Sequence, residues 1–232
     1  MELSASRQMK DLPSRMRRFQ DSDLYVVITQ AFCASRTALD VLDAVLEAGV
    51  RLVQFREKGL EDAEFYRRCL QFRERTRDAG ALLIADDRVD IALATGADGV
   101  HLGQQDMPVR AARLIAPDLI IGASTHSLGE AVTAQEAGAS YVNIGPIFAT
   151  QTKAVPTGAV GPEMIDAIAP HLTVPFTCMG GIKLDNVGEV LRRGARHVAV
   201  VTAVTAAADV KAAARDLRHA IAAARGRDPA AS

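Results

Sequence analysis

The sequence predicts a single (β/α)8 barrel, or TIM barrel, on the basis of two repeated patterns. Five helix-like stretches each end at a glycine, and an apolar stretch begins at once after it. These glycines are Gly49, Gly80, Gly96, Gly138 and Gly194. A glycine ends a helix readily because it adopts the left-handed conformation at little cost. Helical and apolar stretches alternate eight times, which is typical of parallel strands closed into a barrel.

An open doubly wound sheet is the alternative fold, and the loops make it the weaker one. No G-x-G-x-x-G follows the first apolar stretch, and no G-x-x-x-x-G-K-[ST] loop is present. Those glycine-rich loops hold phosphates in many open nucleotide-binding sheets. We therefore expect the closed barrel.

The strands and helices follow in order from these patterns. The first strand, "LYVVIT" at residues 24–29, is apolar or β-branched almost throughout, as expected for a strand covered on both faces. Further strands are expected near residues 52–56, 82–86, 99–102, 119–123, 141–145, 174–178 and 197–202. Helices are expected near residues 37–48, 61–79, 88–95, 108–116, 128–137, 161–169, 184–193 and 207–225.

The chain reads as one domain, because no linker or shift in composition interrupts the alternation. Residues 1–22 are polar and are expected to form an arm or a short helix, residues 23–222 the barrel, and residues 223–232 a disordered tail. The 232 residues are enough for one large α/β domain, and 49% of them are hydrophobic.

Composition also limits the partners and the location. A net charge of −1 and 4% aromatic residues give no basic field and few stacking side chains, so we expect no nucleic-acid partner. No apolar run approaches the roughly 18 residues of a membrane helix, and the first residues lack the apolar core of a signal peptide. Three cysteines without paired spacing favour a reducing compartment. We expect a cytoplasmic protein that acts on small phosphorylated molecules, has no membrane partner and forms homodimers.

In a barrel of this kind the loops after the strands build the active site, so the strand ends carry the functional argument. Polar and charged residues gather there. They are Gln54, Arg56 and Lys58 after the second strand, Asp86 and Asp87 after the third, Asp106 after the fourth, Ser124 and His126 after the fifth, and Thr150, Thr152 and Lys153 after the sixth. Carboxylates beside cations fit Mg²⁺ with a polyphosphate between them.

A second anion site is expected where the last two strands end. Gly180 and Gly181 follow the seventh strand, and Val201 and Thr202 end the eighth. Many barrels hold a phosphate on backbone N–H groups at this place. Two anion sites in one mouth favour an enzyme that joins two phosphorylated small molecules and releases diphosphate.

Other residues have a structural interpretation. Asp87 is expected to cap the following helix, which leaves Asp86 for the site. Cys178 and His101 are expected in the interior. His126 is either a hydrogen-bonding neighbour of the site or an acid or base.

Several long motifs in the same order give a resemblance. "QFREK", "DRVDIALATGADGVHLGQQD", "GASTHS", "GPIFATQTK" and "GGI" stand in the order and spacing of the thiamine-phosphate synthase family, and the similarity covers roughly residues 22 to 220. That family couples a hydroxymethylpyrimidine diphosphate to a thiazole phosphate, carboxylated or not. The resemblance therefore implies a barrel enzyme with Mg²⁺ as cofactor, which forms thiamine phosphate and releases diphosphate.

The resemblance also implies roles for individual residues. Arg56, Lys58, Ser124 and Lys153 would be the catalytic residues, and Asp86 and Asp106 would hold Mg²⁺. The full set of expected substrate-binding residues is Gln54, Phe55, Arg56, Glu57, Lys58, Ala85, Ser124, Thr150, Gln151, Thr152, Lys153, Gly181, Val201 and Thr202.

One departure and two rival functions stay open. The family usually has asparagine where Ala85 stands, so an amide donor to diphosphate is expected to be missing. The related thiazole tautomerase shares "RVDIAL" and "HSLGEAV" and would use His126 to carry the proton. The other rival is a non-catalytic barrel that binds a thiamine precursor.

Overall fold

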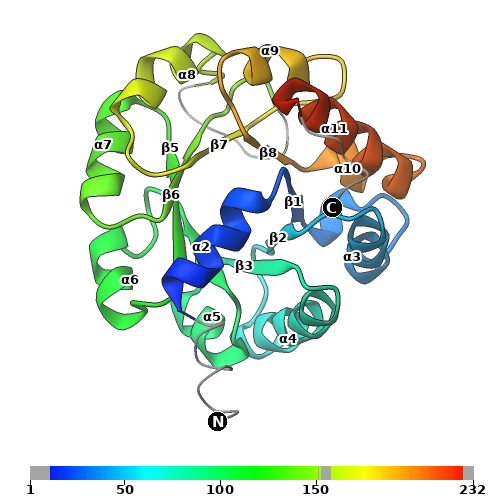
Figure 1. Ribbon diagram of the computed structural model, residues 1–232. Coiled ribbons are helices and arrows are strands. Elements are labelled where there is room, and N and C mark those ends of the chain that lie inside the picture. Colours follow the sequence, from blue (N-terminus) through cyan, green and yellow to red (C-terminus); the bar gives the residue numbers. More distant parts are fainter. Residues whose placement is uncertain (1–10, 151, 153–157, 227–232) are drawn as a thin grey trace.

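Eight parallel strands close into a barrel in the computed structural model, which describes residues 11–150, 152 and 158–226 (Figure 1). Each strand pairs with the next along the chain, and β8 pairs with β1. The strands are β1 (Leu24–Ile28), β2 (Leu52–Phe55), β3 (Leu82–Asp86), β4 (Gly99–Leu102), β5 (Ile120–Thr125), β6 (Tyr141–Ile144), β7 (Phe176–Met179) and β8 (His197–Val200). The predicted fold class is confirmed.

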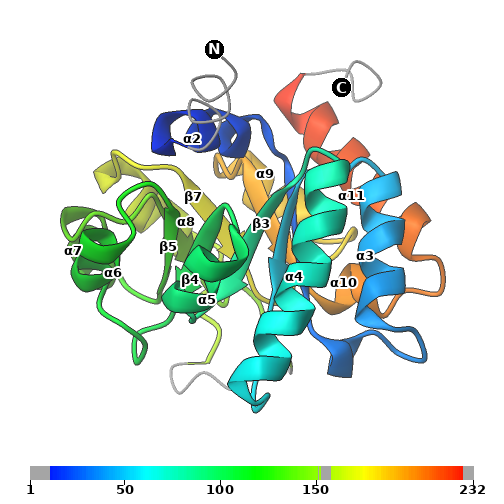
Figure 2. The same cartoon turned by 90° about the horizontal axis from the view of Figure 1, so that it is seen from below.

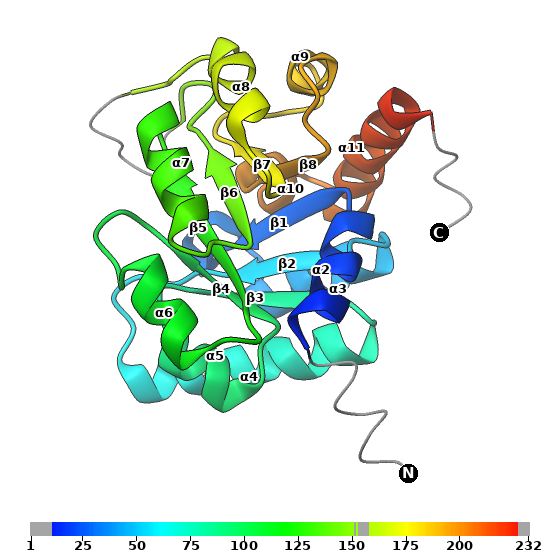
Figure 3. The same ribbon diagram turned by 60° about the vertical axis from the view of Figure 1, so that its left-hand side comes forward.

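Helices surround the barrel and connect its strands (Figures 1 and 3). Those after each strand are α3 (Ala38–Glu47), α4 (Asp62–Asp78), α5 (Val89–Thr95), α6 (Val109–Ile115), α7 (Leu128–Glu136), α8 (Glu163–Ile168), α9 (Val187–Arg192) and α11 (Val210–Arg225). Three short elements were not predicted: η1 (Gln30–Phe32), η2 (Ala169–His171) and α10 (Thr202–Thr205). Local chemistry sets many ends. Thr37 and Asp40 form a capping box on α3, for example, and Gly226 takes φ 65° after α11.

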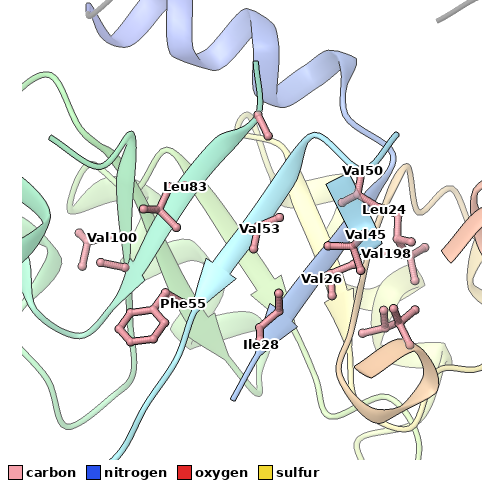
Figure 4. Close-up of a cluster of buried hydrophobic side chains, with 14 of the residues drawn as sticks. Leu24, Val26, Ile28, Val45, Val50, Val53, Phe55, Leu83, Val100 and Val198 are labelled. Atoms are coloured by element: carbon pink, nitrogen blue, oxygen red, sulfur yellow. The ribbon is translucent and has the colours of Figure 1, made fainter. Parts of the chain in front are cut away.

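Side chains alternate between two apolar layers along each strand. Val53, Phe55 and Leu83 point outward and pack between the strands and the helices (Figure 4). Leu82 and Ile84 point inward and belong to a smaller cluster that fills the barrel. This alternation decides which residues at the strand ends can face a site in the barrel mouth.

A short helix, α2 (Leu12–Asp21), lies across the amino-terminal end of the barrel (Figure 2). Phe19 is fully buried, and its ring centroid lies 4.7 Å from that of Tyr141 inside the barrel. Arg15 is also buried, donates to the carbonyl of Asp118 and lies 3.7 Å from the carboxylate of Asp98. Residues 1–10 lie outside the described part of the chain, and the helix at Leu12–Asp21 closes one end of the barrel.

At the other terminus, α11 extends to Arg225, so residues 223–225 are helical and the predicted tail begins too early. Residues 227–232 lie outside the described part of the chain. Among the described residues, no helix is both long and apolar enough to cross a membrane.

We expect His197 to make stability depend on pH. Its ring lies against Phe19, with centroids 4.9 Å apart, and burial, helped by Arg225, lowers its pKa to about 4. The unfolded chain binds a proton near pH 6.5, whereas the folded protein resists it until about pH 4. Stability is therefore lost as pH falls through this window, by about 3 kcal/mol.

The measurement is urea unfolding of the wild type and of His197→Gln between pH 7 and pH 4. The difference between the two isolates this histidine, because all carboxylates are common to both. His219→Gln, on the exposed side of α11, is the control and should follow the wild type. A difference that stays constant with pH would contradict the role of His197.

Candidate active site

A pocket opens where the carboxyl-terminal ends of the strands meet, and it collects most of the predicted polar residues. It is lined by Val27, Phe32, Gln54, Arg56, Lys58, Asp86, Asp87, His101, Gly103, Asp106, Ser124, Thr152, Met179 and Val201. These side chains come from loops that are far apart in sequence. Their convergence is what the barrel topology predicts for the ends of its strands.

Cations and carboxylates meet directly in this pocket. The Nζ of Lys58 lies 3.0 Å from Oδ2 of Asp86 and also pairs with Asp87. The Nε of Arg56 lies 3.8 Å from the same oxygen of Asp86. The Oδ2 of Asp106 accepts the N–H of Gly103 at 2.7 Å.

The surroundings disfavour the ionised forms of the Asp86 and Asp87 carboxylates. Burial is the main reason why the pKa of Asp86 is raised, with Asp106 adding to it and Lys58 and Arg56 opposing it. Burial, and then the charge of Asp86, raises the pKa of Asp87 to about 6. Burial acts to lower the pKa of Lys58, but the two carboxylates together raise it. The site therefore favours an additional cation.

The backbone explains why Asp87 belongs to the pocket. It has φ 59°, and its N–H donates to the carbonyl of His101, so the chain turns sharply after β3. The N-cap of α5 is Arg88, which makes no side-chain capping bond. The expectation that Asp87 caps the helix is wrong, because the left-handed turn directs its carboxylate to Lys58 instead.

A second, smaller pocket lies beside the first, between the ends of β7 and β8. It is lined by Thr150, Thr152, Met179, Gly180, Gly181, Ile182, Lys183, Ala199, Val200, Val201, Thr202 and Ala203. The two pockets share Thr152, Met179 and Val201. They are therefore two parts of one mouth.

Gly180 and Gly181 are required by close packing at this second pocket. They have φ 108° and 63°, which side chains rarely adopt. A Cβ on Gly181 would lie 2.5 Å from the carbonyl oxygen of Ala149, and one on Gly180 would overlap Pro146. The glycines thus let the loop after β6 approach the loop after β7, and leave backbone exposed to the pocket.

The structure brings many of the predicted residues to the mouth, but not all. Those lining it are Gln54, Arg56, Lys58, Asp86, Asp106, Ser124, Thr150, Thr152, Gly181, Val201 and Thr202. Gln151 and Lys153 lie outside the described residues. The ring of Phe55 packs on Phe65 and Phe72 of α4, and Glu57 accepts the N–H of Gln30 at 2.6 Å. Neither of these two residues is among those that line the two pockets.

Ala85 also points away from the mouth. It is fully buried in the outer layer, and its strand partners Phe55 and Val100 belong to the same layer. The expectation that an amide here would reach diphosphate is therefore corrected: asparagine would enter an apolar layer.

We expect Ala85→Asn to lower stability by about 1–3 kcal/mol without raising kcat/KM, since an amide buried without partners is unfavourable. Urea unfolding and steady-state kinetics measure the two quantities. Ala85→Val, which adds similar bulk but no polar group, separates crowding from polarity. An Asn variant with higher kcat/KM would show that its amide does reach the substrate.

The two histidines near the mouth have different surroundings. The ring Nδ1 of His126 forms a hydrogen bond with the carbonyl of Gly145, and the backbone N–H of His126 donates to the carboxylate of Glu130 at 2.7 Å. His126 is not among the residues that line the pocket. His101, predicted to be structural, lines the pocket and lies 2.9 Å from the Oγ of Ser124. Its partner Tyr141 was missed, although a tyrosine within a buried strand signals a hydrogen bond to be satisfied.

Comparison with known proteins agrees with this arrangement. Residues 24–204 match the family described as thiamine monophosphate synthase. This chain belongs to that family. A thiamine-phosphate synthase of Pelotomaculum thermopropionicum is 41% identical over 85% of this chain and 91% of its own length. One of Chloroflexus aurantiacus is 44% identical over 85% and 92%.

Solved structures extend the agreement to three dimensions. The thiamine phosphate pyrophosphorylase of Pyrococcus furiosus has a TM-score of 0.82 and 38% identity, and the match covers 90% of this chain and 98% of that one. A 3-hexulose-6-phosphate synthase has a TM-score of 0.64 at 20% identity, over 85% and 99%. The latter shares the fold alone.

Proposed function

We propose that this member of the thiamine monophosphate synthase family is a transferase that forms thiamine phosphate and diphosphate. Its substrates would be 4-amino-2-methyl-5-(diphosphooxymethyl)pyrimidine and a thiazole phosphate. The observation that carries the proposal is the two-part mouth. One part gathers Arg56, Lys58 and three carboxylates, and the adjoining part is built from glycine and threonine.

The first part suits a diphosphate held with Mg²⁺. No group of three or more His, Cys, Asp and Glu side chains among the described residues is arranged as a metal site by itself. Mg²⁺, however, commonly takes one or two carboxylates and completes its shell with substrate phosphate and water. Asp86 and Asp106 supply hard oxygen ligands, and the raised pKa of Asp86 is the effect that a cation would relieve.

Charge exchange explains how the substrate would bind. Lys58 pairs with Asp86 and Asp87 in the structure, and its side chain is 52% exposed. The bound cation would neutralise the carboxylates, which frees Lys58 to contact diphosphate oxygens. Arg56 faces the same pocket, and Lys153 would join them. Ser124 and Gln54 would contact the pyrimidine diphosphate from the pocket floor.

The reaction follows from this distribution of charge. The C–O bond to diphosphate breaks, and the pyrimidine amino group stabilises the positive charge left on the methylene carbon. When bound, Mg²⁺ stabilises the negative charge of the leaving group. Arg56, Lys58 and Lys153 would stabilise the same charge. The thiazole nitrogen then forms the new bond to carbon, with its phosphate on the backbone near Gly181 and Val201–Thr202.

A direct assay of both reaction products tests the proposal. The protein is incubated with both substrates, and thiamine phosphate is measured by chromatography and diphosphate by ³¹P NMR, with and without Mg²⁺. We expect equal amounts of both products, and only with the metal. Binding without turnover would instead favour the non-catalytic barrel, and proton exchange on the thiazole alone would favour the tautomerase.

Location and assembly remain sequence-based predictions. The three cysteines are buried and not joined in disulfides, which supports a reducing compartment such as the cytoplasm. A homodimer is tested by sedimentation equilibrium.

A further inference from the structure

Five buried polar side chains form a continuous chain of hydrogen bonds inside the barrel, which we call the interior chain. It consists of Gln54, Tyr25, Tyr141, His101 and Ser124, each no more than 8% exposed. The Nε2 of Gln54 lies 2.7 Å from the hydroxyl of Tyr25, which lies 3.1 Å from that of Tyr141. The Nδ1 of His101 lies 2.8 Å from the hydroxyl of Tyr141, and the Nε2 of His101 lies 2.9 Å from the Oγ of Ser124.

The donor at one end favours one direction for the hydrogen bonds of the whole chain. The amide nitrogen of Gln54 can only donate, so the oxygen of Tyr25 accepts and the single proton of Tyr25 is available for Tyr141. With that proton accepted, Tyr141 would donate its own proton to Nδ1 of His101. A neutral imidazole that accepts at Nδ1 carries its proton on Nε2.

This direction reaches the pocket through Ser124. In that tautomer the Nε2–H of His101 would donate to the Oγ of Ser124, which lies 2.9 Å away, and the serine proton would be left for another acceptor. Gln54, His101 and Ser124 all line the pocket. The serine backbone is held as well, since its carbonyl accepts the amide of Gln104 at 2.6 Å.

We propose that the interior chain holds His101 in its Nε2–H tautomer and thereby presents the hydroxyl of Ser124 to the pocket as a hydrogen-bond donor. The acceptor would be a ring nitrogen or a phosphate oxygen of the pyrimidine diphosphate, an identity that rests on the proposed function. Tyr25, Tyr141 and His101 are thus positioning residues, which act on the substrate through Ser124.

Packing holds the side chains of the interior chain in place. The ring of Tyr141 stacks on Phe19 of α2 and on His101, at centroid distances of 4.7 and 5.6 Å. A Cβ on Gly122 would overlap that ring, so a glycine is needed opposite it. Because Tyr25 and Tyr141 are at most 1% exposed, an unsatisfied hydroxyl on either would be costly, which favours one direction for the bonds of the chain.

The first test reads the tautomer in the wild-type protein. The chain has five histidines, so ¹⁵N-histidine labelling gives few signals, and the His101→Gln variant assigns the one of interest. We expect a protonated Nε2 and an unprotonated Nδ1 in the protein without substrate. A proton on Nδ1, or on both nitrogens, would overturn the proposal. This readout does not depend on turnover, so it stands even if the proposed function fails.

The second test asks whether Tyr141 acts through Ser124. Tyr141→Phe keeps the stacked ring and removes only the hydroxyl. We expect mixed tautomers at His101 and about a tenfold loss of kcat/KM for the pyrimidine diphosphate. In a Ser124→Ala background the same change should cost less than about twofold, because the hydroxyl it orients is gone.

Tyr66→Phe, on the exposed side of α4, is the matched control and should change neither readout. Equal losses from Tyr141→Phe with and without Ser124 would overturn the proposal, since the tyrosine would then act by another route.

Discussion

Asp106→Asn is expected to lower kcat/KM at limiting Mg²⁺ by about 10³-fold, because metal stabilisation of a leaving group is worth several kcal/mol. The asparagine oxygen can still accept the N–H of Gly103, so the loop after β4 keeps its bond. The measurement is steady-state kinetics over a range of Mg²⁺ concentrations. Asp216→Asn, on the exposed side of α11, is the control. Full activity of the Asp106 variant at limiting Mg²⁺ would refute the metal assignment.

The same substitution should leave stability unchanged or increase it. Asp106 raises the pKa of Asp86 by charge repulsion and that of Asp87 through a side-chain hydrogen bond, so it opposes the ionised form of both. Removing it relieves this repulsion. Lower activity together with undiminished resistance to urea would identify a functional loss, whereas a destabilised variant would indicate a structural role.

The order and approximate bounds of the main elements could be predicted because glycines at helix ends and apolar runs in strands are local signals. The strand expected at 174–178 is found at Phe176–Met179, and the helix expected at 61–79 at Asp62–Asp78. The short helix α10 was missed, because four residues carry too little pattern to distinguish a helical turn from a loop.

The direction of side chains could not be predicted equally well. Strands buried on both faces read as continuous apolar runs, so the sequence does not reveal which residues point inward. The motif containing Phe55 and the position of Ala85 therefore suggested contacts in the mouth, whereas both side chains lie in the outer layer. Arg56, Lys58 and Asp86 do line the pocket, as the position of charged residues at strand ends indicated.

The interior polar residues were the least visible in the sequence. Tyr25 and Tyr141 stand in apolar stretches and look like ordinary core residues. Only the closed barrel brings them together with His101, from strands that are not adjacent in the chain. A bond between β1 and β6 is a property of barrel closure and cannot be read from a local pattern.

Lys58→Ala is expected to lower kcat/KM by about 10²- to 10³-fold, and His126→Ala to change it only a few-fold. Lys58 lines the pocket and would face the charge that grows on diphosphate as its bond to carbon breaks. His126 does not line that pocket, and its ring bonds the carbonyl of Gly145.

Steady-state kinetics on both variants separate the synthase from the tautomerase, with Lys211→Ala as the control. Lys211 pairs with Glu47 on the outside of the barrel, so its loss removes a lysine charge without touching the mouth. The opposite order, with Lys58→Ala harmless and His126→Ala inactive, would favour proton transfer by His126. That outcome is disfavoured physically, because a tautomerase has no diphosphate charge to stabilise and so no use for Lys58 and Arg56 beside buried Asp86. Three charged groups kept together in one pocket are best explained by a ligand that engages them all.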